Sequence, residues 1–445
     1  MLHGMLEDSF VDVPAGSDFP LANLPWGVFS LPGVDGPPRI GVRLGDTVVD
    51  VSELHRRGLM GGPHLSASPA ARSALVQASL NAFMALGPAC WAEARQRLQR
   101  LLGGAEGALR DNSQLQRSVL HPEAEVAMQL PATIGDYTDF YASRQHATNV
   151  GALFRGPGNE LQPNWLHLPV GYHGRASSIF ASVSSHDNTW VTRPMGQVLP
   201  KGAAQPVLQA SGAVDFELEM GAFIGCGNAL GEPLSVQQAG EQAMFGLVLL
   251  NDWSARDIQA WEYVPLGPFN GKNWATQISP WVVTLDALQP FLTPAPPQDP
   301  PVLPYLHDPQ RLTYDVSLSV DILPKGGHSA ARVTSSNLKH LYWTFPQMVA
   351  HHTVGGCNLR PGDLLGSGTI SGDEPGSQGC LLEITRAGAQ PLDLPLSVEE
   401  GAASGKSRRY LLDGDTVIMR GWCEGEGRHR IGFGECRATV RSRQL

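Results

Sequence analysis

The segment from Asp215 to Met220 alternates three carboxylates with three apolar side chains. Strand periodicity sends the carboxylates to one face and the apolar side chains to the other. Three like charges on one face repel, and a cation relieves that repulsion. Oxygen ligands without a nearby Cys or His favour a hard ion such as Ca²⁺ or Mg²⁺. An edge strand with a solvated acidic face has the same pattern, so the hexapeptide alone leaves both interpretations open.

A second polar group follows a buried-strand pattern that runs from Phe245 to Leu250 and ends at Asp252. The steps from Asp252 to Arg256, Gln259 and Tyr263 are four, three and four residues. These side chains therefore share one face if a helix persists over them. A carboxylate, a guanidinium, an amide and a phenol together suit a polar ligand. The alternative is that Asp252 is an N-cap and Arg256 is its ion-pair partner.

Two further segments contain polar groups of interest. Gly267 to Thr276 is a glycine-rich turn with one lysine, Lys272, but it lacks the spacing of a phosphate-binding loop. Nucleotide binding is therefore not indicated. Asp136 to His146 supplies carboxylates, two tyrosines and a histidine. A single histidine is more often structural than catalytic, so this segment alone does not make His146 a base.

The elements that position these groups fall into two regions. Alternating apolar residues in Arg39–Val51 predict a hairpin that turns at Gly45. Ser68 is a predicted N-cap of a helix that continues to Gly87, and a second helix is expected over Trp91–Leu101. The polar stretch after this helix, residues 103–117, is predicted to be a linker, and the domain boundary is expected near residue 130.

Beyond the boundary the chain is punctuated by glycine. The 50 glycines and 35 prolines favour many turns and short strands, so a mostly β fold is expected. The proline-rich residues 290–309 predict a surface loop. Strands are predicted at Val316–Ile322, Gly362–Gly368, Leu381–Thr385, Asp415–Arg420 and Ile431–Gly434.

Composition limits the partners of the protein. The 445 residues carry a net charge of −10, which argues against nucleic acid or an anionic membrane and favours a small-molecule partner. Neither a signal peptide pattern nor an apolar run long enough to span a bilayer is evident, so a cytoplasmic location is expected. The six scattered cysteines suit reduced core thiols better than disulfides or a zinc site.

Taken together, these segments closely resemble the fumarylacetoacetate hydrolase family. The resemblance implies a mostly β protein, with an N-terminal SH3-like barrel domain with helices over residues 1–130 and a C-terminal catalytic domain over 131–445. The second domain would be a mixed β-roll that forms a homodimer. The matching segments are Asp136–Arg155, Leu168–Ser178, Asp215–Gly221, Asn251–Thr276, Asn358–Thr369, Glu383, Asp413–Asp415 and Arg430–Cys436.

The resemblance also implies two metal sites. The catalytic Ca²⁺ would be held by four carboxylates, those of Asp139, Glu217, Glu219 and Asp252. Asp252, Lys272 and Thr276 resemble a second site, for Mg²⁺. A protonated lysine cannot ligate a cation through its side chain, so that contact is assigned to the backbone carbonyl of Lys272.

The reaction implied by the family is hydrolysis of a carbon–carbon bond in fumarylacetoacetate, a dicarboxylic β-diketone, to fumarate and acetoacetate. This is the last step of tyrosine and phenylalanine breakdown. His146, oriented by Glu383, would take a proton from the attacking water. Arg256, Gln259 and Lys272 would stabilise the oxyanion. The residues that resemble the family's substrate contacts are Tyr141, Arg155, Tyr172, Gln259, Tyr263 and Thr369.

Two other functions are compatible with parts of this pattern. Smaller members of the superfamily hydrolyse acylpyruvates or decarboxylate oxaloacetate with a similar acidic site, but the N-terminal 130 residues argue against such an activity. A catalytically inert Ca²⁺-binding protein could keep the acidic ligands. It would have no use for His146, Glu383, Arg256 and Lys272 together.

Overall fold

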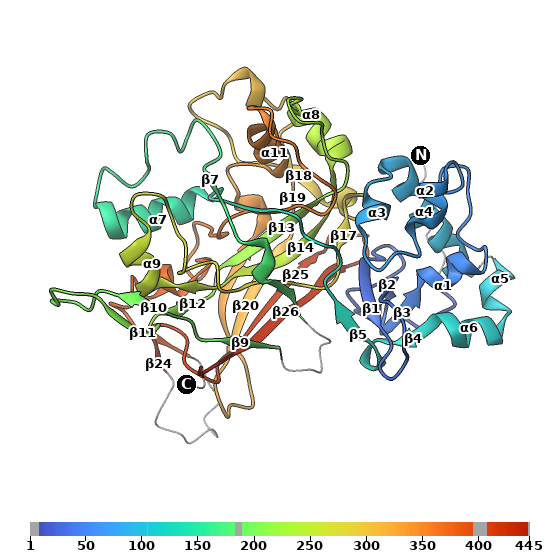
Figure 1. The fold of residues 1–445 in the computed structure, drawn as a ribbon, viewed down its shortest axis with the longest axis horizontal. Helices are drawn as coiled ribbons and strands as arrows, with labels where there is room; N and C mark the ends of the chain where they lie inside the picture. The colour runs from blue at the N-terminus through green and yellow to red at the C-terminus, as the bar shows by residue number, and fades with distance from the viewer. Residues whose placement is uncertain (1–8, 105, 183–188, 395–406, 444–445) are drawn as a thin grey trace.

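The structure is a computed structural model that describes residues 9–104, 106–182, 189–394 and 407–443. A mixed body of helices and short strands, formed by the described residues between 9 and 130, lies at one end of the molecule (Figure 1). The strand-rich remainder, which carries the candidate site, forms the other end. No helix in the described part of the chain is long and apolar enough to cross a membrane.

The N-terminal body contains a five-stranded sheet with the order β4-β3-β2-β1-β5. The predicted hairpin is confirmed, and it turns at Gly45, whose φ of 57° lies in the left-handed region that favours glycine. The strands are β1 (Trp26–Ser30), β2 (Arg39–Leu44), β3 (Thr47–Asp50), β4 (Leu120–Pro122) and β5 (Ala127–Gln129).

The helices of this body differ partly from the prediction. The Ser68 hydroxyl accepts the N–H of Ala71 as an N-cap, but the expected long helix is two short ones separated by turns. The predicted linker is wrong, because it holds two helices that bury Leu109 and Val119. The helices are α1 (Val51–Arg56), α2 (Pro69–Ala74), α3 (Asn81–Met84), α4 (Pro88–Leu102), α5 (Gly107–Arg110) and α6 (Ser113–Val119).

An eight-stranded sheet carries the site in the C-terminal part, which is mostly β as predicted. Its order is β7-β6-β22-β13-β14-β16-β8, and β17 also pairs with β14. The strands are β6 (Tyr137–Phe140), β7 (Gly171–His173), β8 (Ile179–Ala181), β13 (Leu218–Ile224), β14 (Met244–Asp252), β16 (Thr276–Ile278), β17 (Val283–Thr284) and β22 (Leu364–Gly366).

A second sheet of the C-terminal part has five strands in the order β21-β20-β25-β26-β9. It contacts the eight-stranded sheet where β14 meets β25 and β26. The predicted strands at 316–322, 415–420 and 431–434 all belong to it. Its strands are β9 (Trp190–Thr192), β20 (Ser317–Leu323), β21 (Ala331–Asn337), β25 (Thr416–Cys423) and β26 (Ile431–Arg441).

Strand β14 is buried along its whole length and separates two hydrophobic cores. Leu247 and Leu249 belong to the core of the C-terminal part. Phe245, Val248 and Leu250 belong to the core that also contains the N-terminal helices. Alternation along one strand therefore serves both bodies of the molecule.

Two-stranded ribbons and short helices complete the C-terminal part. The ribbons are β10 (Met195–Val198) with β11 (Val207–Ala210), β12 (Val214–Asp215) with β15 (Ser254–Ala255), β18 (Leu292–Pro294) with β19 (Leu312–Tyr314), and β23 (Leu392–Asp393) with β24 (Ser407–Arg408). The α-helices are α7 (Arg144–Arg155), α8 (Val236–Gln238), α9 (Arg256–Glu262), α10 (Leu285–Leu288), α11 (Phe345–Thr353) and α12 (Leu381–Ile384).

The strand predicted at Leu381–Thr385 is wrong, since most of this segment is helix α12. Its first two backbone N–H groups, those of Leu381 and Leu382, donate to the carboxylate of Asp215 at 2.8 and 2.9 Å. A carboxylate at a helix N-terminus satisfies backbone donors that the helix itself leaves unpaired. This distant partner stabilises a helix that the local apolar run does not predict.

Candidate active site

Four carboxylates meet inside the eight-stranded sheet. Asp139 comes from β6, Glu219 from β13 and Asp252 from the end of β14, while Glu217 immediately precedes β13. One oxygen from each lies within 4.8 Å of the others, and all four residues are buried. The site thus joins segments that are more than one hundred residues apart in the sequence.

The solvated acidic face considered for Asp215–Met220 is wrong, because its three carboxylates are 0–5% exposed. The expected grouping of the three also needs correction. Asp215 is outside the cluster, and its carboxylate pairs with Arg256 Nε at 2.9 Å while it holds the start of α12. Only Glu217 and Glu219 of this segment belong to the cluster.

The electrostatics of the cluster are uneven. Burial, followed by the charge of Asp252, raises the pKa of Asp139 well above its usual value. Burial and the charge of Asp139 do the same to the pKa of Glu219. Burial also acts against ionisation of Glu217, but the charges of Lys272 and Arg256 outweigh it and lower that pKa. Asp139 and Glu219 form the side of the cluster that has no salt-bridge partner among the described residues.

A hard cation fits this side. Glu219 Oε1 is buried without a hydrogen-bond partner among the described residues. Gly366 leaves the necessary space, since a Cβ there would lie 2.8 Å from Asp139 Oδ1 and 3.1 Å from Glu219 Oε2. The donors are all carboxylate oxygens, the ligand type that Ca²⁺ and Mg²⁺ prefer. These residues are suited to hold such an ion.

Replacing Gly366 with alanine is expected to weaken Ca²⁺ binding by about tenfold or more, because the new methyl group would displace ligand oxygens from their positions. Isothermal titration calorimetry with CaCl₂ measures this effect. Gly355→Ala is the matched control, because nothing lies within 4 Å of a Cβ at Gly355. Unchanged Ca²⁺ affinity in a folded Gly366→Ala protein would contradict the assignment of a cation site beside Asp139 and Glu219.

Lys272 lies on the opposite side of the cluster. Its Nζ pairs with Glu217 Oε2 at 2.5 Å and with Asp252 Oδ2 at 2.6 Å. Thr276 Oγ1 donates to Asp252 Oδ1 at 3.1 Å, so both Asp252 oxygens have donors. The Lys272 ammonium group therefore lies beside the Asp252 carboxylate, which was expected to bind Mg²⁺.

Arg256 occupies the first position of α9, whose N-cap is Ala255. The interpretation of Asp252 as the N-cap is therefore wrong, and the partners of Arg256 are Asp215 and Glu217, the latter at 2.6 Å. Arg256 Nη1 also donates to Gln259 Oε1 at 3.2 Å, one turn along the helix. The guanidinium and the amide are thus held together at the edge of the cluster.

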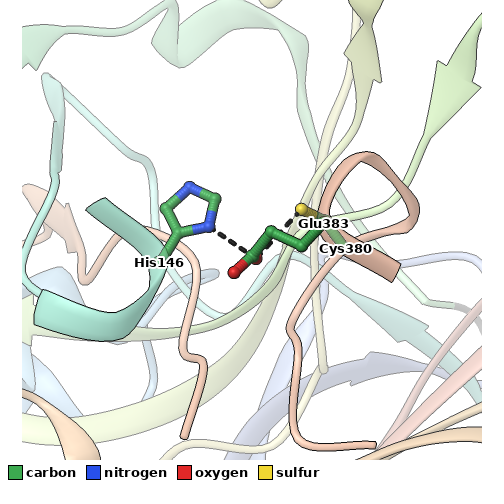
Figure 2. Close-up of side chains that lie close together, drawn as sticks. All are labelled: His146, Cys380 and Glu383. Carbon is green, nitrogen blue, oxygen red and sulfur yellow. Dashed lines mark hydrogen bonds and ion pairs between the residues drawn. The ribbon is translucent and has the colours of Figure 1, made fainter. Parts of the chain in front are cut away.

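His146 lies in the first turn of α7, where the Ser143 hydroxyl accepts its backbone N–H. Its Nδ1 lies 2.6 Å from Glu383 Oε2 on α12, and both residues are buried (Figure 2). Burial acts against ionisation of Glu383, but the adjacent His146 and several hydrogen bonds lower its pKa. An ionised Glu383 accepts a hydrogen bond from Nδ1–H, which leaves Nε2 as the nitrogen that can accept a proton.

The predicted substrate contacts are placed unevenly. The Tyr141 ring meets the His146 ring edge-on with centroids 5.2 Å apart. The Tyr172 hydroxyl donates to Asp252 Oδ2 at 3.2 Å. Thr369 Oγ1 is buried without a hydrogen-bond partner among the described residues. Tyr141 thus lies beside His146, and Tyr172 lies beside the carboxylate cluster.

Arg155 and Tyr263 lie further out. The Arg155 guanidinium, at the end of α7, donates to the backbone carbonyls of Asn159 and Glu160. The pKa of Tyr141 is raised, first by burial and then by the charge of Glu383, and the charge of Arg155 opposes this rise. Tyr263, just after α9, has an exposed fraction of 49%. Neither side chain contacts the carboxylate cluster.

The sequence did not reveal three residues around Glu383. Asn149 donates to Glu383 Oε1, and Ser371 and Cys380 donate to Oε2. The spacing of Asn149, three residues after His146 on one helix, could have indicated it. No local signal marks the other two. All six cysteines are free, as predicted, and Cys380 is one of four that are buried.

Comparisons with known proteins show which family the chain resembles. Residues 22–131 match the family model described as Fumarylacetoacetase N-terminal, and residues 136–441 match Fumarylacetoacetate (FAA) hydrolase C-terminal. Fumarylacetoacetase from Homo sapiens is 52% identical over 97% of this chain and 98% of its own length. The Arabidopsis thaliana fumarylacetoacetase is 50% identical over the same shares.

A solved structure shares the fold. The crystal structure of a protein assigned as HpcE from Mycobacterium smegmatis has a TM-score of 0.50 and 20% sequence identity, and the match covers 94% of this chain and 99% of that chain. This level of identity speaks for the fold alone. The two family models and the relatives of about 50% identity along nearly the whole length carry the assignment. The chain belongs to the fumarylacetoacetate hydrolase family.

Proposed function

We propose that this protein hydrolyses fumarylacetoacetate to fumarate and acetoacetate. The observation that carries the proposal is the buried His146–Glu383 pair, 2.6 Å apart, in a chain about 50% identical to fumarylacetoacetases. A base held by a carboxylate is the arrangement that activates water, and the acidic cluster beside Arg256 and Lys272 suits a substrate rich in oxygen.

His146 Nε2 takes a proton from a water molecule while Glu383 holds Nδ1–H. The resulting hydroxide adds to the carbonyl carbon next to the fumaryl double bond, and the carbonyl π electrons move to oxygen. When this oxyanion collapses, the carbon–carbon bond breaks and its electron pair leaves as the enolate of acetoacetate. The enolate takes up a proton, so water is consumed and both products are carboxylates.

Arg256, Gln259 and Lys272 are placed to stabilise the oxyanion. Arg256 and Lys272 remain charged beside Glu217, and Gln259 is held by Arg256 Nη1. Preorganised donors in a buried site act on developing charge without reorganisation. A Ca²⁺ ion held by the four carboxylates would polarise the diketone oxygens. A Mg²⁺ site at Asp252, Lys272 and Thr276 remains a prediction from the family resemblance.

Product analysis tests this function directly. ¹H NMR of the metal-loaded protein with fumarylacetoacetate should show fumarate and acetoacetate appearing in equal amounts. An acylpyruvate and oxaloacetate are offered in parallel, since hydrolysis of the first or decarboxylation of the second would reveal a different activity of the superfamily. Failure to cleave fumarylacetoacetate, together with turnover of either alternative, would refute the proposal.

For substrate recognition we assign Tyr141, Tyr172, Gln259, Tyr263 and Thr369 as contacts and Arg155 as the partner of the distal carboxylate. A planar guanidinium can pair with a carboxylate through two hydrogen bonds, which lysine cannot reproduce. Arg155 lies near enough to Tyr141 to affect its pKa, which burial raises. The competing role for Arg155 is to hold the loop that begins after α7, through the carbonyls of Asn159 and Glu160.

Arg155→Lys is expected to raise KM for the diacid by roughly tenfold or more, about 1.4 kcal/mol. KM for a diketo acid without the distal carboxylate should change little, because that substrate never uses the guanidinium. Steady-state kinetics on both substrates measure the difference. Arg144→Lys, at the start of the same helix, is the matched control. Equal losses on both substrates would assign Arg155 to the loop instead.

The proposal has wider parts that come from the sequence and its family resemblance. They are an SH3-like barrel within residues 1–130, a catalytic β-roll over 131–445, a homodimer and a cytoplasmic location. Light scattering of the purified protein at several concentrations measures the oligomeric state. A mass equal to one chain throughout would remove the homodimer from the proposal and leave the chemistry unaffected.

A further inference from the structure

Four donors surround the Glu383 carboxylate, and three of them converge on one oxygen. Oε2 accepts from His146 Nδ1 at 2.6 Å, from Ser371 Oγ at 2.9 Å and from Cys380 Sγ at 3.2 Å. Asn149 Nδ2 donates to Oε1 at 2.9 Å. Figure 2 shows the imidazole and the thiol approaching the carboxylate from different sides. The orienting group of the base is therefore itself held in place.

The thiol acts here as a donor. His146, Cys380 and Glu383 lie close enough together to hold a metal ion. A cysteine binds metal as its thiolate, however, and burial followed by the charge of Glu383 raises the pKa of Cys380 well above its ordinary value. The proton on sulfur is thus retained and points to the carboxylate. A neutral hydrogen-bond donor is the role that fits this environment.

Ser371 is joined to the histidine helix by a second route, through its backbone. The Ser143 hydroxyl donates to the Ser371 carbonyl at 3.1 Å, and the Ser371 N–H approaches the same hydroxyl at 3.4 Å. Ser143 is also the N-cap that accepts the N–H of His146. These contacts use only the backbone of Ser371, so the Ser371 hydroxyl can be removed without breaking the link to α7.

We propose that Ser371 and Cys380 are positioning residues for His146 that act through Glu383 Oε2. This inference rests on the proposed role of His146 as the base. Two fixed donors restrict the rotation of a buried carboxylate, and they share the charge of the oxygen that binds Nδ1. The imidazole is then aligned by a carboxylate with one orientation. Neither residue touches the reacting atoms.

Kinetics of single and double variants test the route of action. Ser371→Ala should lower kcat about tenfold and leave KM within twofold, because it removes a donor to Glu383 Oε2 and so loosens the alignment of the base. It also removes the acceptor of the Gly379 N–H, a loss that the Glu383→Gln background shares. In a Glu383→Gln background the same substitution should cost less than twofold. Cys380→Ala should lower kcat several-fold, whereas Cys380→Ser, which keeps a donor, should retain most of the activity.

Two controls separate positioning from a general loss of packing. Ser336→Ala removes a buried hydroxyl that donates to the Ile370 carbonyl beside Ser371, and Cys423→Ala removes a buried thiol in β25. Both should keep kcat within about twofold. An equal cost of Ser371→Ala with and without the Glu383 carboxylate overturns the proposal. Equal losses in Cys380→Ser and Cys380→Ala overturn it for the thiol.

A spectroscopic measurement makes the test independent of the substrate. The Nδ1 proton between His146 and Glu383 should give a downfield ¹H resonance, identified by its disappearance in His146→Ala. Ser371→Ala leaves more charge on Oε2 for Nδ1, so this resonance should move further downfield. An unchanged resonance overturns the proposal. Absence of turnover in the wild-type protein would instead overturn only the proposed function, because the resonance requires no substrate.

Discussion

Replacing His146 with alanine is expected to lower kcat on fumarylacetoacetate by about 10²–10⁴-fold, the usual contribution of a positioned general base. KM and Ca²⁺ affinity should change little, because His146 does not belong to the carboxylate cluster. Steady-state kinetics and calorimetry measure the two effects separately. His167→Ala, an exposed histidine in the same part of the chain, is the control and should retain wild-type kinetics.

Glu383→Gln should follow His146→Ala, because the amide no longer holds Nδ1–H as an ionised carboxylate does. The two residues act as one unit, so the double variant should lose little more activity than the less active of the two single variants. A fully multiplicative loss would show that they contribute independently. That outcome would leave Glu383 as a structural acceptor with no part in orienting the base.

Removing the metal is expected to abolish activity reversibly while the fold persists. A bound ion contributes several kcal/mol of charge stabilisation, so the rate should fall by at least about 10²-fold and return when Ca²⁺ is added. The two large apolar cores do not depend on the cluster, and circular dichroism should therefore show little change. Elemental analysis verifies that the chelated protein is free of metal.

Glu219→Gln is the substitution that corresponds to removing the metal, because it removes one anionic ligand at nearly constant side-chain volume. Among the described residues, Glu219 has no salt-bridge partner, so the change breaks no ion pair. Its Ca²⁺ affinity should fall at least tenfold. Asp321→Asn, in β20, is the control and should keep wild-type affinity. Full activity in a metal-free protein would end the case for a catalytic ion.

Local sequence patterns predicted the helices and strands that are stabilised by residues close to them in the sequence. Gly45 allows the left-handed turn of the hairpin, and the Ser68 hydroxyl accepts the Ala71 N–H in the first turn of α2. The segment at Leu381 was predicted as a strand because its apolar residues fit one. Its helix depends on the carboxylate of Asp215, 166 residues earlier in the sequence. A partner that distant leaves no trace in a short window of sequence.

The same limit applies to the site. Alternation in Asp215–Met220 indicated three acidic side chains on one face, but it could not show that Arg256 withdraws Asp215 from the cluster. Asp252 ends its strand as the pattern predicts, and the helix of the Asp252–Tyr263 periodicity begins only at Arg256. The periodicity could not show that the partner of Asp252 is Lys272. Which carboxylate meets which cation is decided by tertiary packing.

The shared strand β14 has a consequence for how substitutions far from the site act. Phe83 and Trp91 of the N-terminal body pack edge-on against Phe245, seven residues before Asp252 of the carboxylate cluster. Truncating either ring would leave a cavity against the strand, and its relaxation would reach the ligand through the backbone. The N-terminal body therefore supports the strand that carries Asp252. A substitution in this body can lower catalytic activity although every catalytic side chain is unchanged.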